Sequence, residues 1–217
     1  SLQFEATQQD GGWQSSSQLA FFQQDSDSQL TPMRGSANAT ANLDADENLS
    51  GQLQLQFDDL GWLEGLVPQI SQVGGSLGGQ LDLSGTLDNP RVRADLSLED
   101  GSLAVQALGI ELQGIETTLA SAGPDRLLIN GVVQSSDGRL NFSSQIDNLL
   151  SDSRELDVRI AGSDFTLANL PDLQLTISPD IRLQADAQGI NVSGQLFVPL
   201  LSAEINTLPE TAVDVSS

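Results

Sequence analysis

The residues that could do chemistry in this chain are almost all carboxylates. There are 30 Asp and Glu residues but no His and no Cys, so the usual general base near neutral pH and nearly all zinc sites are missing. Carboxylate pairs could hydrolyse glycosides, but nothing singles out such a pair. Asp44-Ala45-Asp46-Glu47-Asn48 is similar to the start of a calcium loop, yet Leu49 and Leu55 stand where that loop needs Gly and Glu. We therefore expect no catalytic residue, no metal and no cofactor, and a protein that is not an enzyme.

Charge and composition narrow the function classes further. The formal net charge is −22, and the eight basic residues are scattered arginines rather than a basic patch, so we expect no nucleic-acid partner. Apolar residues make up 38% of the chain but aromatic residues only 4%. Leu, Ile, Val and Ala must therefore form any interior, which we expect to be aliphatic.

Alternation of apolar and polar residues is the commonest pattern and predicts β-strands with one wet face. Leu77, Leu81 and Leu83 share one parity, for example, with polar residues between them. Asp137-Gly138 predicts a tight hairpin, and Glu99-Asp100-Gly101 predicts another turn. The fold class is thus all-β, an elongated antiparallel sheet with the spacing of a meander.

One segment departs from alternation and predicts a short amphipathic helix over residues 59–73. Its apolar residues recur at helical spacing after the capping candidates Asp58 and Asp59, although Pro68 favours a kink. A glycine-rich link follows it. We therefore divide the chain into N-terminal strands (1–57), the helix with its link (58–75) and a strand repeat (76–217), as one continuous unit truncated at both ends. No membrane-spanning run or signal peptide is present, so we expect any anchor to lie outside this sequence.

Strands that are apolar on one face can bury it in a solenoid, in a sandwich or in a curled open trough. Alternation alone does not choose among these three. The low aromatic content argues mildly against a compact sandwich, whose core typically uses Trp, Tyr or Phe.

From residue 58 onward, short motifs occur in an order and spacing that resemble a known family. The sequence resembles the C-terminal region of the TamB (DUF490) family of translocation and assembly module proteins, which are AsmA-like bridge-like lipid-transfer proteins. It departs from the family at Pro199-Leu200-Leu201, where a small residue and Ala often follow the proline. The motifs are Trp62-Leu63-Glu64, Pro68-Gln69, Gly85-Thr86-Leu87-Asp88-Asn89-Pro90-Arg91-Val92, Ala107-Leu108-Gly109-Ile110-Glu111-Leu112, Asn169-Leu170-Pro171, Ile177-Ser178-Pro179-Asp180, Val192-Ser193-Gly194-Gln195-Leu196-Phe197-Val198-Pro199 and Leu208-Pro209-Glu210-Thr211-Ala212-Val213.

The resemblance implies a β-taco, a sheet curled into an open trough with an aliphatic lining. It also implies a periplasmic location between the inner and outer membranes, in a full-length protein anchored to the inner membrane. The implied partners are phospholipid acyl chains and the outer-membrane barrel TamA. The implied roles are phospholipid supply to the outer membrane, or assembly and secretion of outer-membrane barrels and autotransporters.

Our leading hypothesis is a non-enzymatic lipid conduit lined by residues of the apolar parity. One alternative is a chaperone-like scaffold that pairs its sheet edge with nascent outer-membrane strands, and another is a closed dry core; self-association through sheet edges also stays open. In the helix, we expect packing or partner contacts from Leu60, Trp62, Leu63, Leu66, Val67 and Ile70. The predicted lining residues are Leu83, Leu96, Leu98, Val105, Leu112, Val133, Phe142, Val158, Ile160, Leu175, Ile177, Leu183, Val192 and Leu196.

Overall fold

The structure is a computed structural model that describes residues 2–9, 12–24, 30–149, 151 and 153–204, with side chains described from Gly35 onward. These residues are almost entirely β-strand. The strands are β1 (Leu2–Gln9), β2 (Gly12–Gln24), β3 (Leu30–Leu43), β4 (Leu49–Phe57), β5 (Ile70–Gly85), β6 (Pro90–Val105), β7 (Ile110–Ser121), β8 (Arg126–Ser135), β9 (Gly138–Asp147), β10 (Glu155–Ser163), β11 (Phe165–Asn169), β12 (Leu173–Asp186) and β13 (Gly189–Ala203). Two 3-10 helices complete the described elements, η1 (Gly61–Gly65) and η2 (Gln106–Leu108).

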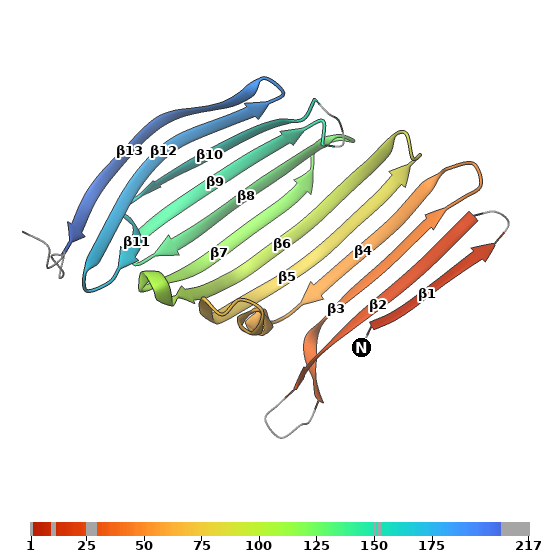
Figure 1. Cartoon of the computed structure of the whole chain (residues 1–217), viewed down its shortest axis with the longest axis horizontal. Coiled ribbons are helices and arrows are strands. Elements are labelled where there is room, and N and C mark those ends of the chain that lie inside the picture. The colour runs from red at the N-terminus through yellow and green to blue at the C-terminus, as the bar shows by residue number, and fades with distance from the viewer. Residues whose placement is uncertain (1, 10–11, 25–29, 150, 152, 205–217) are drawn as a thin grey trace, which may run out of the picture.

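Thirteen strands form one antiparallel sheet that follows the order of the sequence (Figure 1). Each strand from β1 to β9 pairs with the strand after it, β10 pairs with β12, and β12 pairs with β13. β11 continues the line of β10 beyond Asp164 and pairs with the first half of β12. The predictions of an all-β fold and of an antiparallel meander are confirmed.

The hairpin predicted at Asp137-Gly138 is confirmed, but the turn predicted at Glu99-Asp100-Gly101 is wrong. β8 and β9 pair up to Ser135 and Gly138, which leaves a two-residue loop. Asp100 instead lies inside β6, where its positive φ of 51° accompanies a register shift against β7. The same kind of residue, polar and tolerant of positive φ, therefore makes a bulge here rather than a turn.

The helix predicted over residues 59–73 is also wrong in extent. Only Gly61–Gly65 is helical, in a single 3-10 turn, and the strand β5 already begins at Ile70. Ile70 pairs with Val105, and the glycine-rich stretch after it is strand with register shifts rather than a link. Glycine and proline weaken the helix interior, whereas the neighbouring β6 supplies a full ladder of backbone hydrogen bonds.

The sheet is open and not strongly curled, which corrects the expectation of a taco-like trough. Its register shifts cluster toward one end of the strands, as at Leu98/Gly101 in β6, Gln113/Glu116 in β7 and Thr166/Ala168 in β11. Bulges bend a strand locally. These bulges therefore bend the strands near the ends that carry η1, η2 and β11 (Figure 1).

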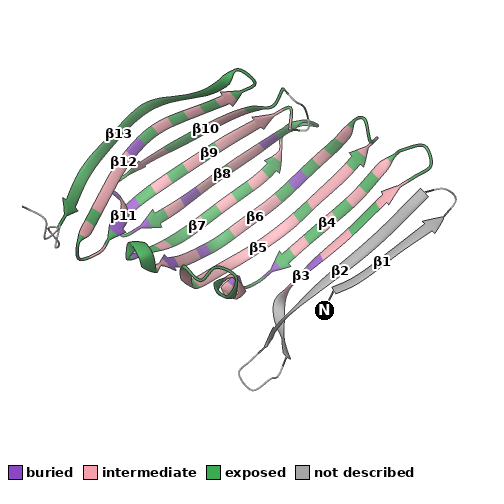
Figure 2. Ribbon diagram, in the orientation of Figure 1, coloured by how far each residue is buried: buried purple, intermediate pink, exposed green. Residues whose placement is uncertain are grey.

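Burial follows the alternation of the sequence without producing a closed core. Along β4, half-buried residues alternate with exposed ones, and the same banding crosses most of the sheet (Figure 2). Within the described residues, only ten apolar side chains are buried. The protein is thus essentially one layer, in which one face is apolar but incompletely covered.

Candidate functional site: the apolar face of the sheet

Residues paired directly across neighbouring antiparallel strands project to the same face, so the register traces continuous rows of side chains. Two adjacent rows cross the sheet from β3 to β13, and we call the surface to which they belong the apolar face. The first row is Ala37, Leu55, Gly79, Leu96, Leu119, Ile129, Ser144, Val158, Leu183 and Val192. The second row is Gly35, Phe57, Leu77, Leu98, Thr117, Gly131, Phe142, Ile160, Ile181 and Gly194.

No position in these two rows carries a charged residue. Nine steps between ten strands, at about 4.8 Å each, make the rows about 43 Å long. Most of their side chains are only half-buried, and Ile160 and Val192 are 37% and 60% exposed. The apolar face is therefore an extended aliphatic surface rather than the inside of a sandwich.

The register places all fourteen predicted lining residues on the apolar face. Leu96, Val158, Leu183 and Val192 belong to the first row, and Leu98, Phe142 and Ile160 to the second. Leu83, Val133, Leu175, Ile177 and Leu196 share the parity of these rows in neighbouring positions. Leu112 and Val105 lie beyond bulges that reset the parity of β7 and β6, and pairing returns them to the same face, since Leu112 pairs with Ser135 and Val105 with Ile110. Their contact with lipid stays a prediction.

Residues such as Leu119, Ile129 and Ile181 complete these rows but were not among the predicted lining residues. They have the same alternating parity, so the sequence contained their signal. Only the pairing register of the strands shows that Leu119 and Ile129 lie between Leu96 and Val158 in the first row.

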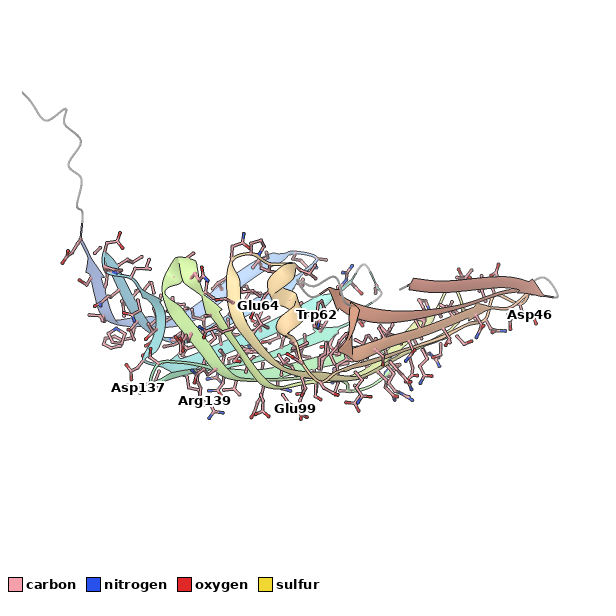
Figure 3. The ribbon with its side chains drawn as sticks, turned by 90° about the horizontal axis from the view of Figure 1, so that it is seen from below. Asp46, Trp62, Glu64, Glu99, Asp137 and Arg139 are labelled. Atoms are coloured by element: carbon pink, nitrogen blue, oxygen red, sulfur yellow. The ribbon has the colours of Figure 1, made fainter. Side chains whose placement is uncertain are left out.

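The predicted helix residues divide into two groups. Leu60 is buried, and Trp62 and Leu63 pack with it against Phe57 and neighbouring residues of the apolar face. The rings of Phe57 and Trp62 lie 5.5 Å apart between centroids. Leu66 and Val67 are exposed, and Ile70 is part of β5. In the side view, η1 with Trp62 lies on one side of the sheet, while Glu99 and Arg139 point away on the other (Figure 3).

A second cover lies where β11 passes the ends of β7, β8 and β9. Phe165 and Ala168 are 4% and 3% exposed. The Ser135 hydroxyl, itself buried, donates a 2.7 Å hydrogen bond to the backbone oxygen of Thr166. The carbonyl of Asn169 approaches Gly109, where an added Cβ would lie 2.4 Å from the oxygen. One corner of the apolar face is therefore closed by the chain itself.

The opposite face carries charges held in cross-strand pairs. Arg159 and Arg182 stand directly opposite each other, and each is paired diagonally with a carboxylate, Asp180 and Asp157 respectively. The Arg182 guanidinium lowers the pKa of Asp157. These pairs offset the repulsion between the two arginines and keep this face polar.

A hollow of about 810 Å³ on this face is lined mainly by polar side chains, including Asn130, Ser143 and Gln195.

Within the described residues, no group of three His, Cys, Asp or Glu side chains is arranged to hold a metal. None of the helices in the described part of the chain has the length and apolar character needed to cross a membrane.

A single-layer meander with one charged face and one incompletely covered aliphatic face defines an elongated, one-sided β-sheet protein. Residues 5–98 match the TamB N-terminal domain, and residues 133–217 match the TamB C-terminal domain. The chain therefore belongs to the TamB family. The resemblance to this family noted from residue 58 is confirmed, although residues 58–98 match the N-terminal rather than the C-terminal domain, and the match begins earlier, at residue 5.

The relationship is distant. The translocation and assembly module subunit TamB of Haemophilus influenzae (strain ATCC 51907 / DSM 11121 / KW20 / Rd) is 21% identical over 176 residues, which are 81% of this chain. The matched region is 13% of that protein's length. No solved structure matches the chain.

Proposed function

We propose that this chain is a section of a non-enzymatic, bridge-like protein that shields phospholipid acyl chains on its apolar face during outer-membrane biogenesis. The observation that carries this proposal is the uncharged, half-exposed surface that runs across ten strands. Contiguous apolar patches larger than a few hundred Å² are rare on soluble monomers, and they usually mark a binding surface.

The energetics of the surface suit acyl chains. Each buried methylene contributes about 0.8 kcal/mol, so a chain lying along the rows gains affinity without any specific polar contact. The rows, about 43 Å long, exceed the roughly 15 Å of hydrocarbon in one leaflet of a bilayer. Several acyl chains could lie one after another, while their headgroups remain in water beyond the edge of the sheet.

Membership of the TamB family supports a cellular setting for this activity. We place the chain in the periplasm, within a longer protein anchored to the inner membrane by a segment outside this sequence. Because the relative is named a translocation and assembly module subunit, we propose the outer-membrane barrel TamA as the partner that receives its cargo.

Site-specific photocrosslinking in cells tests the conduit in the full-length protein. A photoreactive residue at Leu96, Val105 or Val158 should attach phospholipid, because these positions lie on the apolar face. The matched controls are Arg93 and Arg159, which project from the opposite face. Protein adducts without lipid at the apolar positions, or equal lipid labelling of both faces, would contradict the proposal.

A second candidate function is a scaffold that pairs its edge with nascent strands of outer-membrane barrels. The observation that favours it is β13, an edge strand without a charged residue in which Phe197 and Leu201 are 67% and 66% exposed. Natural edge strands usually carry charges that prevent pairing, and β13 lacks this protection. An added strand would complete its backbone hydrogen bonds.

Proline substitutions distinguish this scaffold from the conduit. Successive N–H groups along a strand point to opposite edges, so Asn191→Pro and Val192→Pro test the two edges of β13 in turn. The scaffold predicts that the proline at the free edge abolishes barrel assembly, while lipid crosslinking at Val158 persists. Normal assembly with both proline variants would exclude pairing at this part of the edge, and a change in oligomeric state would point to self-association instead.

A further inference from the structure

The η1 segment occupies part of the surface on which we propose that acyl chains lie. Leu60, Trp62 and Leu63 pack on a patch of the apolar face that spans β3 to β6. We call these three side chains the η1 cover. The patch beneath the cover consists of Ala37, Leu55, Phe57, Leu77 and Leu98, all of which belong to the two rows.

The η1 cover makes the kind of contact that a ligand of the apolar face would make. Its side chains are aliphatic or aromatic, and they shield residues that are otherwise open to water. Phe57 beneath it is 4% exposed, whereas Ile160 in the same row, far from the cover, is 37% exposed. An acyl chain and the cover cannot occupy this patch together.

The cover is held in place by the apolar contacts of its side chains and by hydrogen bonds that two carboxylates accept. η1 is a single 3-10 turn with no buried residue within Gly61–Gly65, and the Asp59 carboxylate accepts a 2.8 Å hydrogen bond from the N–H of Gly61. Beyond its apolar contacts, Glu64 accepts a 2.7 Å hydrogen bond from the backbone N–H of Val73 and so ties η1 to β5. An added Cβ at Gly65 would meet no atom within 4 Å. The hydrogen bond of Glu64 is thus a link between η1 and β5 that a single substitution removes.

We infer that the η1 cover is an intramolecular plug that apolar ligands displace from the β3 to β6 section. The inference rests on the proposed conduit function and adds a gate to it. Without ligand, the plug hides the aliphatic patch from water. When acyl chains reach this section, they replace Leu60, Trp62 and Leu63, and η1 swings away from the sheet. The section around Val158 lies outside the plug and remains open throughout.

Tryptophan fluorescence of the 217-residue chain tests the plug. Trp13→Phe leaves Trp62 as the only tryptophan, and palmitoyl lysophosphatidylcholine serves as the apolar probe. We expect the lipid to shift Trp62 emission to the red and to increase its quenching by acrylamide, because Trp62 leaves Phe57 for water. In parallel, a photoreactive residue at Val158 reports lipid binding away from η1.

A variant pair tests how the plug is fastened. Glu64→Ala removes the hydrogen bond to Val73, so the lipid concentration that releases Trp62 should fall by about fivefold. Glu155→Ala is the matched control, since it removes an exposed carboxylate far from η1 and should leave that concentration unchanged. The Val158 crosslink should have the same lipid dependence in both variants.

The outcomes separate the plug from the conduit. Lipid crosslinking at Val158 without any change in Trp62 emission or quenching would overturn the plug and leave the conduit standing. An equal effect of Glu64→Ala and Glu155→Ala would overturn the role of the Val73 hydrogen bond in fastening it. The absence of a crosslink at Val158 at any lipid concentration would overturn the proposed conduit function, and with it the plug that rests on that function.

Discussion

The packing of Phe142 over Gly131 gives a prediction whose size follows from the structure. The two residues pair directly between β8 and β9, in the second row of the apolar face. A Cβ added at Gly131 would lie 2.2 Å from Cζ of Phe142 and 2.8 Å from the carbonyl oxygen of Glu116. The ring can turn away, but the carbonyl belongs to the paired backbone of β7. Gly131→Ala should therefore lower the free energy of unfolding by about 1–3 kcal/mol, as overpacking commonly does.

Gly78→Ala is the matched control. Gly78 also lies within a strand, but an added Cβ there would meet no atom within 4 Å. Both substitutions reduce the entropy of the unfolded chain, so their difference isolates the steric contact at Gly131. We expect Gly78→Ala to be neutral or stabilising by up to about 1 kcal/mol.

Thermal and urea unfolding, followed by far-UV circular dichroism, measure both variants. For a chain of this length, each kcal/mol corresponds to about 2–4 °C in Tm. Gly131→Ala should thus melt several degrees below Gly78→Ala. Equal melting temperatures would refute the steric argument and show that the sheet relaxes around Phe142 at little cost.

Three other predictions concern the apolar face, its corner cover and the charged pairs. Val158→Asp should abolish lipid crosslinking at Leu96 or Val105. It should change Tm little, because Val158 is only half-buried. Unchanged crosslinking would contradict the conduit. Ser135→Ala removes the hydrogen bond to Thr166 and should cost about 1 kcal/mol in urea unfolding, whereas Ser136→Ala, next to it and exposed, should cost less. The hydrogen bond from Arg182 is the first cause that lowers the pKa of Asp157. The stability that Asp157 contributes is therefore present above its unfolded pKa and is lost as the pH falls through its lower folded pKa. Asp157→Asn should flatten the acid limb of the plot of unfolding free energy against pH, and an unchanged acid limb would show that the pair contributes nothing.

Alternation was sufficient to predict the strands and their apolar sides, because a sheet with one wet face requires period two. It failed at residues 59–73, where Leu60, Leu63, Val67 and Ile70 recur as on a helix although the last of them belongs to β5. The helix-like spacing there arises because residues of two different elements face the same side of the sheet. Leu60 and Leu63 face the sheet from the η1 turn, and Ile70 faces the same side from a strand.

The bulges and the overall curvature could not be read from the sequence. Asp100 has the features of a turn residue, and only its pairing with β7 shows that the chain continues through it. The degree of curl depends on small register shifts summed over thirteen strands. The hydrophobic pattern changes parity between Leu98 and Leu103, but a bulge within one strand and a turn between two strands both produce such a change. The position of the apolar face was therefore predictable, but the small curl of the sheet was not.

The charge distribution opposes stacking of two chains through their incompletely covered apolar faces. Two such faces would bury a large aliphatic area by stacking, and the formal charge of −22 on each chain opposes that approach. The positions of the two rows are uncharged, so this repulsion does not compete with a neutral acyl chain. In the proposed function, an acidic chain with an uncharged aliphatic face would therefore repel copies of itself without repelling an acyl chain.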